Sequence, residues 1–208
     1  GKCVHNPHGS GKVSPGLAVR SYPVVERHTL VWIWMGDRTP DPAAIPDYGC
    51  LDGGPGLLVT KPGYLRVEGG YELLVDNLLD LSHVSYTHAG LLGNDDIVRA
   101  EVEVREDGDV VTVSRNVPGA ETPGIHRLAR PGEFDRGDQW NSISWFAPSN
   151  LLLTVGVSRE GAPKDSGTGY FALHFLTPET ALTTHYRYSA ALWGVSEEAD
   201  RERGVRDM

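Results

Sequence analysis

The stretch Asn77-Leu-Leu-Asp80-Leu-Ser-His83-Val-Ser-Tyr-Thr-His88 places an amide, a carboxylate and two imidazoles within twelve residues. These groups lie in a leucine-rich run that has the spacing of a helix. A buried polar or ionisable group that finds no partner costs several kcal/mol. A metal ion held by the two histidines is a partner that would remove this cost.

The spacing of the two histidines requires a bend. On a straight helix Asp80 lies between them, but His83 and His88 are about 140° apart, too far for two ligands of one ion. A kink, a π-bulge or a helix end near Ser85-Tyr86 would bring them together. Two neutral imidazoles and one carboxylate, with open positions, are the ligands of non-haem Fe(II) centres. Asp80 can accept a hydrogen bond from a ligating ring or face a redox partner. A pair of surface or capped core histidines is the alternative that the spacing leaves open.

The overall composition limits the class of protein. A chain of 208 residues is long enough for one large domain, or for a domain and part of another. The net charge of −9 argues against nucleic acid or an anionic membrane as the main partner. No apolar run approaches the length that spans a bilayer, so we expect no membrane segment. Cys3 and Cys50 predict free thiols in a reducing compartment, the cytoplasm, although a disulfide between them stays open.

Alternating and apolar runs, separated by glycine and proline, predict a mostly antiparallel fold. The run 71–81 is expected to be helical, residues 116–137 to form loops, and the charged run 197–203 to begin a helix. Prolines after residue 36 predict a domain boundary near residue 42. Close strands beside a leucine-rich helix indicate an α+β domain in which a curved sheet grips a long helix. The predicted strands are 21–28, 29–35, 64–67, 98–105, 108–114, 140–145, 151–157, 169–176 and 183–188.

The spacing Asn77-x-x-Asp80-x-x-His83-x4-His88 resembles the mononuclear iron motif of Rieske non-haem iron oxygenases. Within that family it is most similar to the oxygenase components of vanillate O-demethylase and related aromatic O-demethylases. The resemblance covers nearly the whole chain. Its supporting segments are Val31-Trp-Ile-Trp-Met-Gly-Asp37, Ile45-Pro-Asp47, Leu176-Thr-Pro-Glu-Thr180 and Thr184-His-Tyr186.

The resemblance implies a role for each residue of the motif. His83 and His88 would ligate Fe(II), and Asn77 would lie near the iron. Asp80 would connect by hydrogen bonds to a Rieske-cluster histidine of a neighbouring subunit. The catalytic domain would have the helix-grip fold, similar to START and Bet v1 proteins, assembled as a homotrimer.

The resemblance also implies the reaction and its electron supply. Electrons from NAD(P)H would pass through a reductase or ferredoxin to a [2Fe–2S] Rieske cluster, and then to the iron of another subunit. Oxygen would hydroxylate the methoxy carbon of a small aromatic acid similar to vanillate, releasing formaldehyde and a phenol. Ring hydroxylation at the same iron site is one alternative. A non-catalytic helix-grip domain that binds an apolar ligand is another.

Two departures from the family pattern shape the expected domains. A Rieske cluster needs two Cys-x-His-type pairs, and only Cys3 and His5 form one, so we expect neither to be a ligand. We interpret residues 1–42 as the last strands of a Rieske domain without its cluster ligands, and residues 43–208 as the catalytic domain. The third iron ligand is expected to be an aspartate beyond residue 208, so this piece alone is predicted to be inactive.

His174 is the candidate substrate-binding residue outside the motif. It lies on an apolar predicted strand, from which it can hold a substrate carboxylate or hydroxyl. A core histidine whose hydrogen bonds are satisfied is the alternative that the pattern leaves equally open.

Overall fold

The computed structural model describes residues 1–133 and 135–196, which divide into two compact units, Gly1–Tyr48 and a second unit that begins at Gly49. The first unit contains a two-stranded antiparallel hairpin, β1 (Val24–Arg27) and β2 (Leu30–Ile33), and the short 3-10 helix η1 (Pro42–Ala44). The division falls six residues after the predicted boundary at residue 42. That this unit is the end of a Rieske domain stays a prediction.

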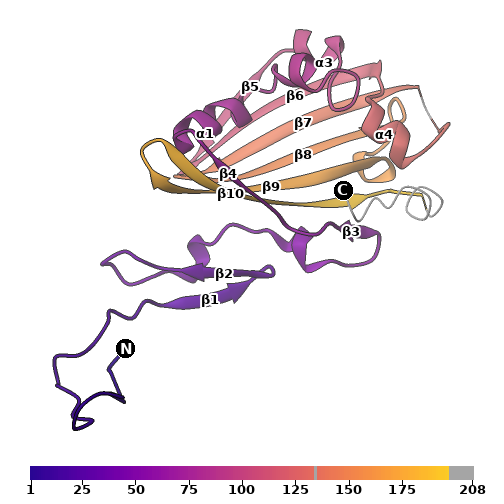
Figure 1. Ribbon diagram of the computed structural model, residues 1–208. Coiled ribbons are helices and arrows are strands. Elements are labelled where there is room, and N and C mark those ends of the chain that lie inside the picture. Colours follow the sequence, from indigo (N-terminus) through magenta and orange to yellow (C-terminus); the bar gives the residue numbers. More distant parts are fainter. Residues whose placement is uncertain (134, 197–208) are drawn as a thin grey trace. The chain divides into compact units, whose positions relative to one another are not determined.

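The second unit is built on an eight-stranded antiparallel sheet (Figure 1). Its order is β3-β10-β9-β8-β7-β6-β5, and β4 also pairs with β10. From β5 to β10 each strand pairs with the next in sequence, so successive hairpins make up most of the sheet. The strands are β3 (Leu57–Val59), β4 (Gly63–Val67), β5 (Glu103–Asp107), β6 (Val110–Glu121), β7 (Arg136–Phe146), β8 (Asn150–Ser158), β9 (Thr168–Thr180) and β10 (Thr183–Trp193).

The helices of this unit are short and pack on the curved sheet (Figure 1). Helix α1 contacts β7 and β9, α3 contacts β6, and α4 contacts β9. None of the helices in the described ranges is long and apolar enough to cross a membrane. The helices are α1 (Tyr71–Leu79), α2 (Val84–Thr87), α3 (Asp95–Arg99) and α4 (Gly124–Ala129), with the 3-10 helices η2 (Gly49–Asp52) and η3 (Lys164–Ser166).

The core forms where α1 and α4 cover one face of the sheet. Val75 of α1 packs in a buried cluster with Leu151 of β8. Val155, four residues further along β8, packs in a second cluster with Ile125 of α4. Side chains four apart on a strand point to the same face. The two helices therefore cover the same face of the sheet.

The α+β class and the antiparallel sheet are confirmed, and three local predictions are wrong. The strand expected at residues 98–105 begins only at Glu103, because Asp95–Arg99 form helix α3. Helix α1 ends at Leu79, so it is short rather than long. The segment 116–137 is not mainly loop, because β6 continues to Glu121 across an irregularity between Val117 and Ala120, and α4 follows. Gly119, with a φ of +59°, supplies the left-handed conformation that this irregularity uses. The three-residue strand β3 was missed because it is too short to show a period. The helix predicted to begin at residue 197 lies outside the described residues.

Candidate metal centre and substrate cavity

A tight turn after α1 creates the bend that the two histidines need. Asp80 is the C-terminal cap of α1, and its Oδ1 accepts hydrogen bonds from the Ser82 N–H, at 2.9 Å, and from the Ser82 hydroxyl. A carboxylate that bonds to the backbone two residues on mimics a backbone turn. The chain thus leaves the α1 axis at residues 80–83, earlier than the predicted break near residues 85–86.

His83 and His88 come together because one short turn of helix connects them. Helix α2 lies between them, and the His88 N–H donates to the Val84 carbonyl at 3.1 Å. The ring centroids are 5.7 Å apart at an interplanar angle of 70°. Rings at this separation can reach one metal ion with a bond of about 2 Å on each side.

The hydrogen bond of His83 suits a metal ligand. Its Nδ1 lies 2.5 Å from the main-chain carbonyl oxygen of Asp80. A carbonyl can only accept, so Nδ1 carries the proton and Nε2 keeps its lone pair. Metal-binding histidines commonly donate their other ring N–H to a carbonyl or carboxylate in this way. In the part of the chain that the structure describes, no third His, Cys, Asp or Glu joins the pair.

The Asp80 side chain forms its hydrogen bonds with Ser82 and not with either imidazole, and the Asp80 backbone carbonyl holds His83 instead. The hydrogen bonds from Ser82 lower the pKa of the Asp80 carboxyl, and the charges of His83 and Arg115 lower it further. The carboxylate therefore stays ionised and close to solvent. The prediction that it accepts a hydrogen bond from a ligating ring is replaced by this backbone contact.

A cavity of about 290 Å³ opens beside the histidine pair. Asn77 of α1, His83 and His88 line one side of it, and His174 of β9 lines another. Four of the five predicted site residues therefore share one cavity, and Asp80 lies outside its lining. The remaining lining residues are Leu74, Leu78, Leu81, Val84, Leu92, Asn141, Ile143, Leu153, Val155, Tyr170 and Tyr186.

His174 is buried, and only one of its two ring nitrogens has a hydrogen-bond partner among the described residues. Its Nδ1 lies 2.6 Å from the Tyr186 hydroxyl, whereas its Nε2 has no hydrogen-bond partner among the described residues. Burial lowers the pKa of His174 to about 4, so the ring is neutral at pH 7. Burial and the neighbouring Tyr188 raise the pKa of Tyr186 to about 12, so its hydroxyl stays protonated. This half-satisfied state favours a binding residue over the core histidine that the sequence left open.

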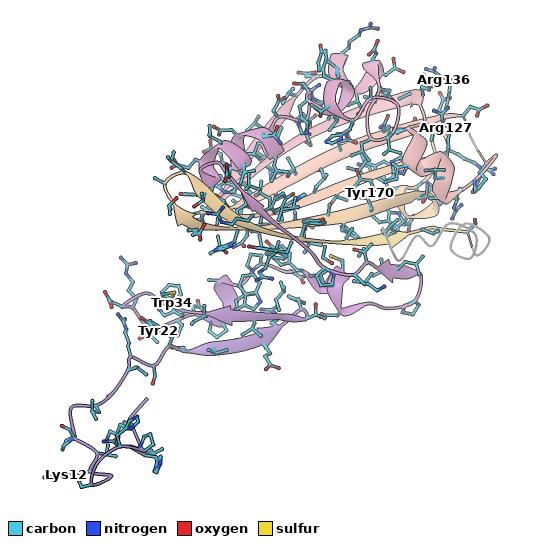
Figure 2. All side chains as sticks on the ribbon, viewed as in Figure 1. Lys12, Tyr22, Trp34, Arg127, Arg136 and Tyr170 are labelled. Carbon is cyan, nitrogen blue, oxygen red and sulfur yellow. The ribbon has the colours of Figure 1, made fainter. Side chains whose placement is uncertain are left out.

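A second cavity, of about 220 Å³, lies between α4 and the strands β9 and β10. It shares Tyr170, His174 and Tyr186 with the first, so the two are neighbours. Tyr170, labelled in Figure 2, stacks on His126 of α4 with ring centroids 6.1 Å apart and an interplanar angle of 27°. Sequence reasoning missed Tyr170, Tyr186 and His126. Only the strand register places the two tyrosines, and His126 lies in the segment 116–137, which was predicted to form loops.

Comparison with known proteins agrees with this geometry. The model of the vanillate O-demethylase oxygenase C-terminal domain matches residues 67–203. The dicamba O-demethylase oxygenase component of Stenotrophomonas maltophilia is 41% identical over 198 residues, which are 92% of this chain and 56% of that protein. A crystal structure of dicamba monooxygenase bound to 3,6-dichlorosalicylic acid has a TM-score of 0.85 and 36% identity, covering 100% of this chain and 62% of that one. Another, with non-heme iron and dicamba, has a TM-score of 0.78 and 35% identity, covering 100% and 59%.

Together the antiparallel sheet, the paired histidines and these matches define the C-terminal part of a Rieske oxygenase alpha subunit, with a helix-grip-like fold. The chain belongs to the vanillate O-demethylase oxygenase C-terminal domain family. It spans about half the length of the curated relatives that it matches. The predicted family and fold are therefore confirmed.

Proposed function

We propose that this chain is the catalytic part of an oxygenase component that removes the methyl group of a methoxylated aromatic acid, releasing formaldehyde. The observation that carries the proposal is the pairing of His83 and His88 beside an apolar cavity, within a family of O-demethylase oxygenases. The dicamba O-demethylase relative supports the reaction type. The vanillate-like substrate is our own extension.

His83 and His88 fit a mononuclear Fe(II) site. The His83 ring is oriented by the Asp80 carbonyl, and both rings line the cavity that the substrate would enter. The dicamba monooxygenase structure that contains non-heme iron supports this metal. Bound here, iron would supply the redox centre for O2 activation. A carboxylate would complete the ligand set of such a site.

The other side chains of the cavity would bind and orient the substrate. The neutral His174 ring, with its unpartnered Nε2, would hold the carboxylate or hydroxyl of the aromatic acid. The apolar side chains of the sheet would pack on the ring and exclude water, so that the methoxy carbon faces His83 and His88. Asn77, on the same side of the cavity as these histidines, would adjust the polarity near the metal.

The electron supply follows from the family. We propose that a [2Fe–2S] Rieske cluster in the full-length protein receives electrons from NAD(P)H through a reductase or ferredoxin. Asp80, whose ionised carboxylate is close to solvent, would face the cluster histidine of a neighbouring subunit in a homotrimer. We propose that the protein acts in a reducing compartment, the cytoplasm, because its sequence contains only two cysteines.

Formaldehyde release tests the function directly. The full-length oxygenase, supplied with a reductase, NAD(P)H and O2, is expected to release formaldehyde from at least one methoxybenzoate in a panel. Hydroxylated products without formaldehyde would favour ring hydroxylation instead. An enzyme with a loaded cluster and iron that consumes no oxygen with any aromatic acid would favour the non-catalytic alternative.

A further inference from the structure

Helix α2 has no buried side chain, although it connects the two histidines of the metal centre. His83 is its N-terminal cap and His88 its C-terminal cap, so the orientation of α2 sets the direction in which both rings project. Most helices in proteins are held in place by the burial of an apolar face. Since α2 lacks such a face, its position depends on other contacts.

The two imidazoles are not held in the same way. Nδ1 of His83 donates to the Asp80 carbonyl, which orients that ring. The His88 ring lies 5.7 Å from the His83 ring, centroid to centroid, and within the described residues it has no hydrogen-bond partner. A histidine that ligates a metal is commonly oriented by a hydrogen bond from its other ring N–H. The placement of the His88 ring therefore follows from the backbone of α2 and of the loop after it.

One side chain of α2 forms a hydrogen bond outside the segment 83–88. The Ser85 hydroxyl donates to the main-chain carbonyl of Asn94, nine residues further along the chain, at 2.8 Å. The Thr87 hydroxyl donates to the His83 carbonyl, so its hydrogen bond stays inside the segment. In the described part of the chain, Ser85 thus provides the side-chain hydrogen bond that connects α2 to the rest of the protein.

Asn94 is itself fixed to the sheet by its side chain. Its Oδ1 caps α3 by accepting from the Ile97 N–H at 3.0 Å, and its Nδ2 donates to Oε1 of Gln139, at 3.1 Å, and to the Glu121 carbonyl. Gln139 is a residue of β7 that is 2% exposed, and Glu121 is the last residue of β6. The two strands pair with each other. The carbonyl that accepts from Ser85 therefore belongs to a residue with a well-defined position.

The residue before Asn94 runs close against α2. A Cβ at Gly93 would lie 3.1 Å from the main-chain carbonyl carbon of Val84 and 2.7 Å from its Cγ2. These separations are below the optimum of about 3.5–4.0 Å between carbon atoms, so only glycine fits without displacing α2. We call the contact of Val84 and Ser85 with Gly93 and Asn94 the α2 seam. Because the seam is tight, a change on one side of it moves the other.

We propose that Ser85 is a positioning residue of the metal centre, whose hydroxyl ties α2 to Asn94 and thereby places the His88 ring beside His83 for a shared ion. This inference rests on the proposed function, because it concerns the Fe(II) that this function needs. Without the Ser85 hydrogen bond, α2 keeps the contact of His83 with Asp80 at one end. No buried side chain of α2 then fixes the direction of the other end.

Metal affinity tests the proposal separately from catalysis. Fe(II) is titrated calorimetrically and without oxygen into the full-length protein, whose cluster is loaded and oxidised and whose mononuclear site has been emptied. We expect Ser85→Ala to weaken the binding of Fe(II) about tenfold, as the loss of groups that orient metal ligands commonly does. Ser85→Thr keeps a hydroxyl, so its affinity should stay within about threefold of the wild type.

A spectroscopic signature accompanies the affinity. The EPR spectrum of the nitric oxide adduct of the bound Fe(II) reports the arrangement of the ligands around the metal, and the oxidised cluster gives no signal. We expect this spectrum to change in Ser85→Ala and to be restored in Ser85→Thr. A variant that is merely less stable, with an intact site, would keep the wild-type spectrum.

Two further variants complete the test. Gly93→Ala adds a methyl group to the α2 seam and removes no polar group, so it should weaken Fe(II) binding in the same direction as Ser85→Ala. Ser158→Ala is the matched control, because the Ser158 hydroxyl also donates to a main-chain carbonyl, that of Ala162, at 3.2 Å, and Ser158 does not line the cavity. It should lose a comparable hydrogen bond and keep the wild-type affinity and spectrum.

Failure of this inference is distinguishable from failure of the proposed function. If Ser85→Ala binds Fe(II) as the wild type does, with the same spectrum, the role of Ser85 is overturned and the function stands. An equal loss of affinity in Ser85→Thr or in Ser158→Ala would overturn it as well, because the Ser85 hydroxyl would then not be the cause. If the wild type binds no Fe(II) at its mononuclear site, the function and this inference both fail.

Discussion

The Tyr186 hydroxyl lies 2.6 Å from Nδ1 of His174, and this contact fixes which side of the imidazole faces the cavity. The two rings are on neighbouring strands, with centroids 5.8 Å apart, so the fold itself sets the contact. Since the other ring nitrogen has no partner among the described residues, the pair presents one free hydrogen-bonding atom to a ligand.

Tyr186→Phe tests this orientation. The substitution keeps the ring and removes the hydroxyl, so the His174 ring loses the partner that selects its tautomer. We expect the KM for the aromatic acid to rise about threefold to tenfold, with a smaller change in kcat, because one neutral hydrogen bond is lost. Steady-state kinetics of the full-length enzyme provide the measurement. An unchanged KM would show that the hydroxyl does not position His174. Tyr64→Phe, on an exposed tyrosine whose hydroxyl bonds His185, is the control.

Because two histidines are buried in the folded state, we predict that the protein loses stability in mild acid. Burial lowers the pKa values of His126 and His174 to about 4, below the value of 6.5 for an unfolded histidine. The unfolded state therefore takes up protons first as the pH falls. The contribution of each neutral histidine to the free energy of unfolding is fully present above pH 6.5 and declines as the pH falls toward 4. Between pH 6.5 and pH 5 the loss is about 2 kcal/mol for each histidine.

Denaturant unfolding at pH 7 and pH 5 measures this loss. His126→Leu, which cannot take up a proton, should reduce the pH dependence by about half relative to the wild type. Equal pH dependence in the His126 variant and the wild type would contradict the buried, neutral state of His126.

Asp80→Asn separates the structural and electronic roles of Asp80. An amide oxygen can still accept from Ser82, so the turn and the His83 orientation should survive. Iron content is expected to match the wild type, whereas formaldehyde release should fall about tenfold to a hundredfold if an ionised carboxylate forms the contact between subunits. Metal analysis and formaldehyde assay on one preparation give both values. If the Asp80→Asn variant turned over as fast as the wild type, the proposed role of Asp80 in electron transfer would be wrong.

Leu151→Ala tests the core beneath α1. Leu151 is 0% exposed and packs against the cluster that contains Val75. Removing its side chain should lower the free energy of unfolding by about 2–5 kcal/mol. Leu73→Ala, on the exposed side of the same helix, should change it by less than about 0.5 kcal/mol. Equal effects of the two variants would contradict the packing described for this face.

The sequence predicted the motif and most strands, but not how the site closes. The mismatch between a five-residue histidine spacing and the helical period revealed that a bend was needed. The position of the bend depended on the Asp80–Ser82 hydrogen bonds, which are local to one turn and which the helical period does not show. The contact between His174 and Tyr186 could not be predicted, because a strand pattern shows which face a residue takes and not which residue on the next strand lies opposite.

Iron content and oxygen-dependent formaldehyde release, measured together on the full-length protein and on His83→Ala and His88→Ala, test the central claim most directly. The account predicts about one mononuclear iron per wild-type subunit beyond the cluster, and loss of that iron and of formaldehyde release in each variant. The cluster spectrum should stay unchanged, which excludes global unfolding. Wild-type iron content and turnover in either variant would contradict the claim that these two histidines form the metal centre.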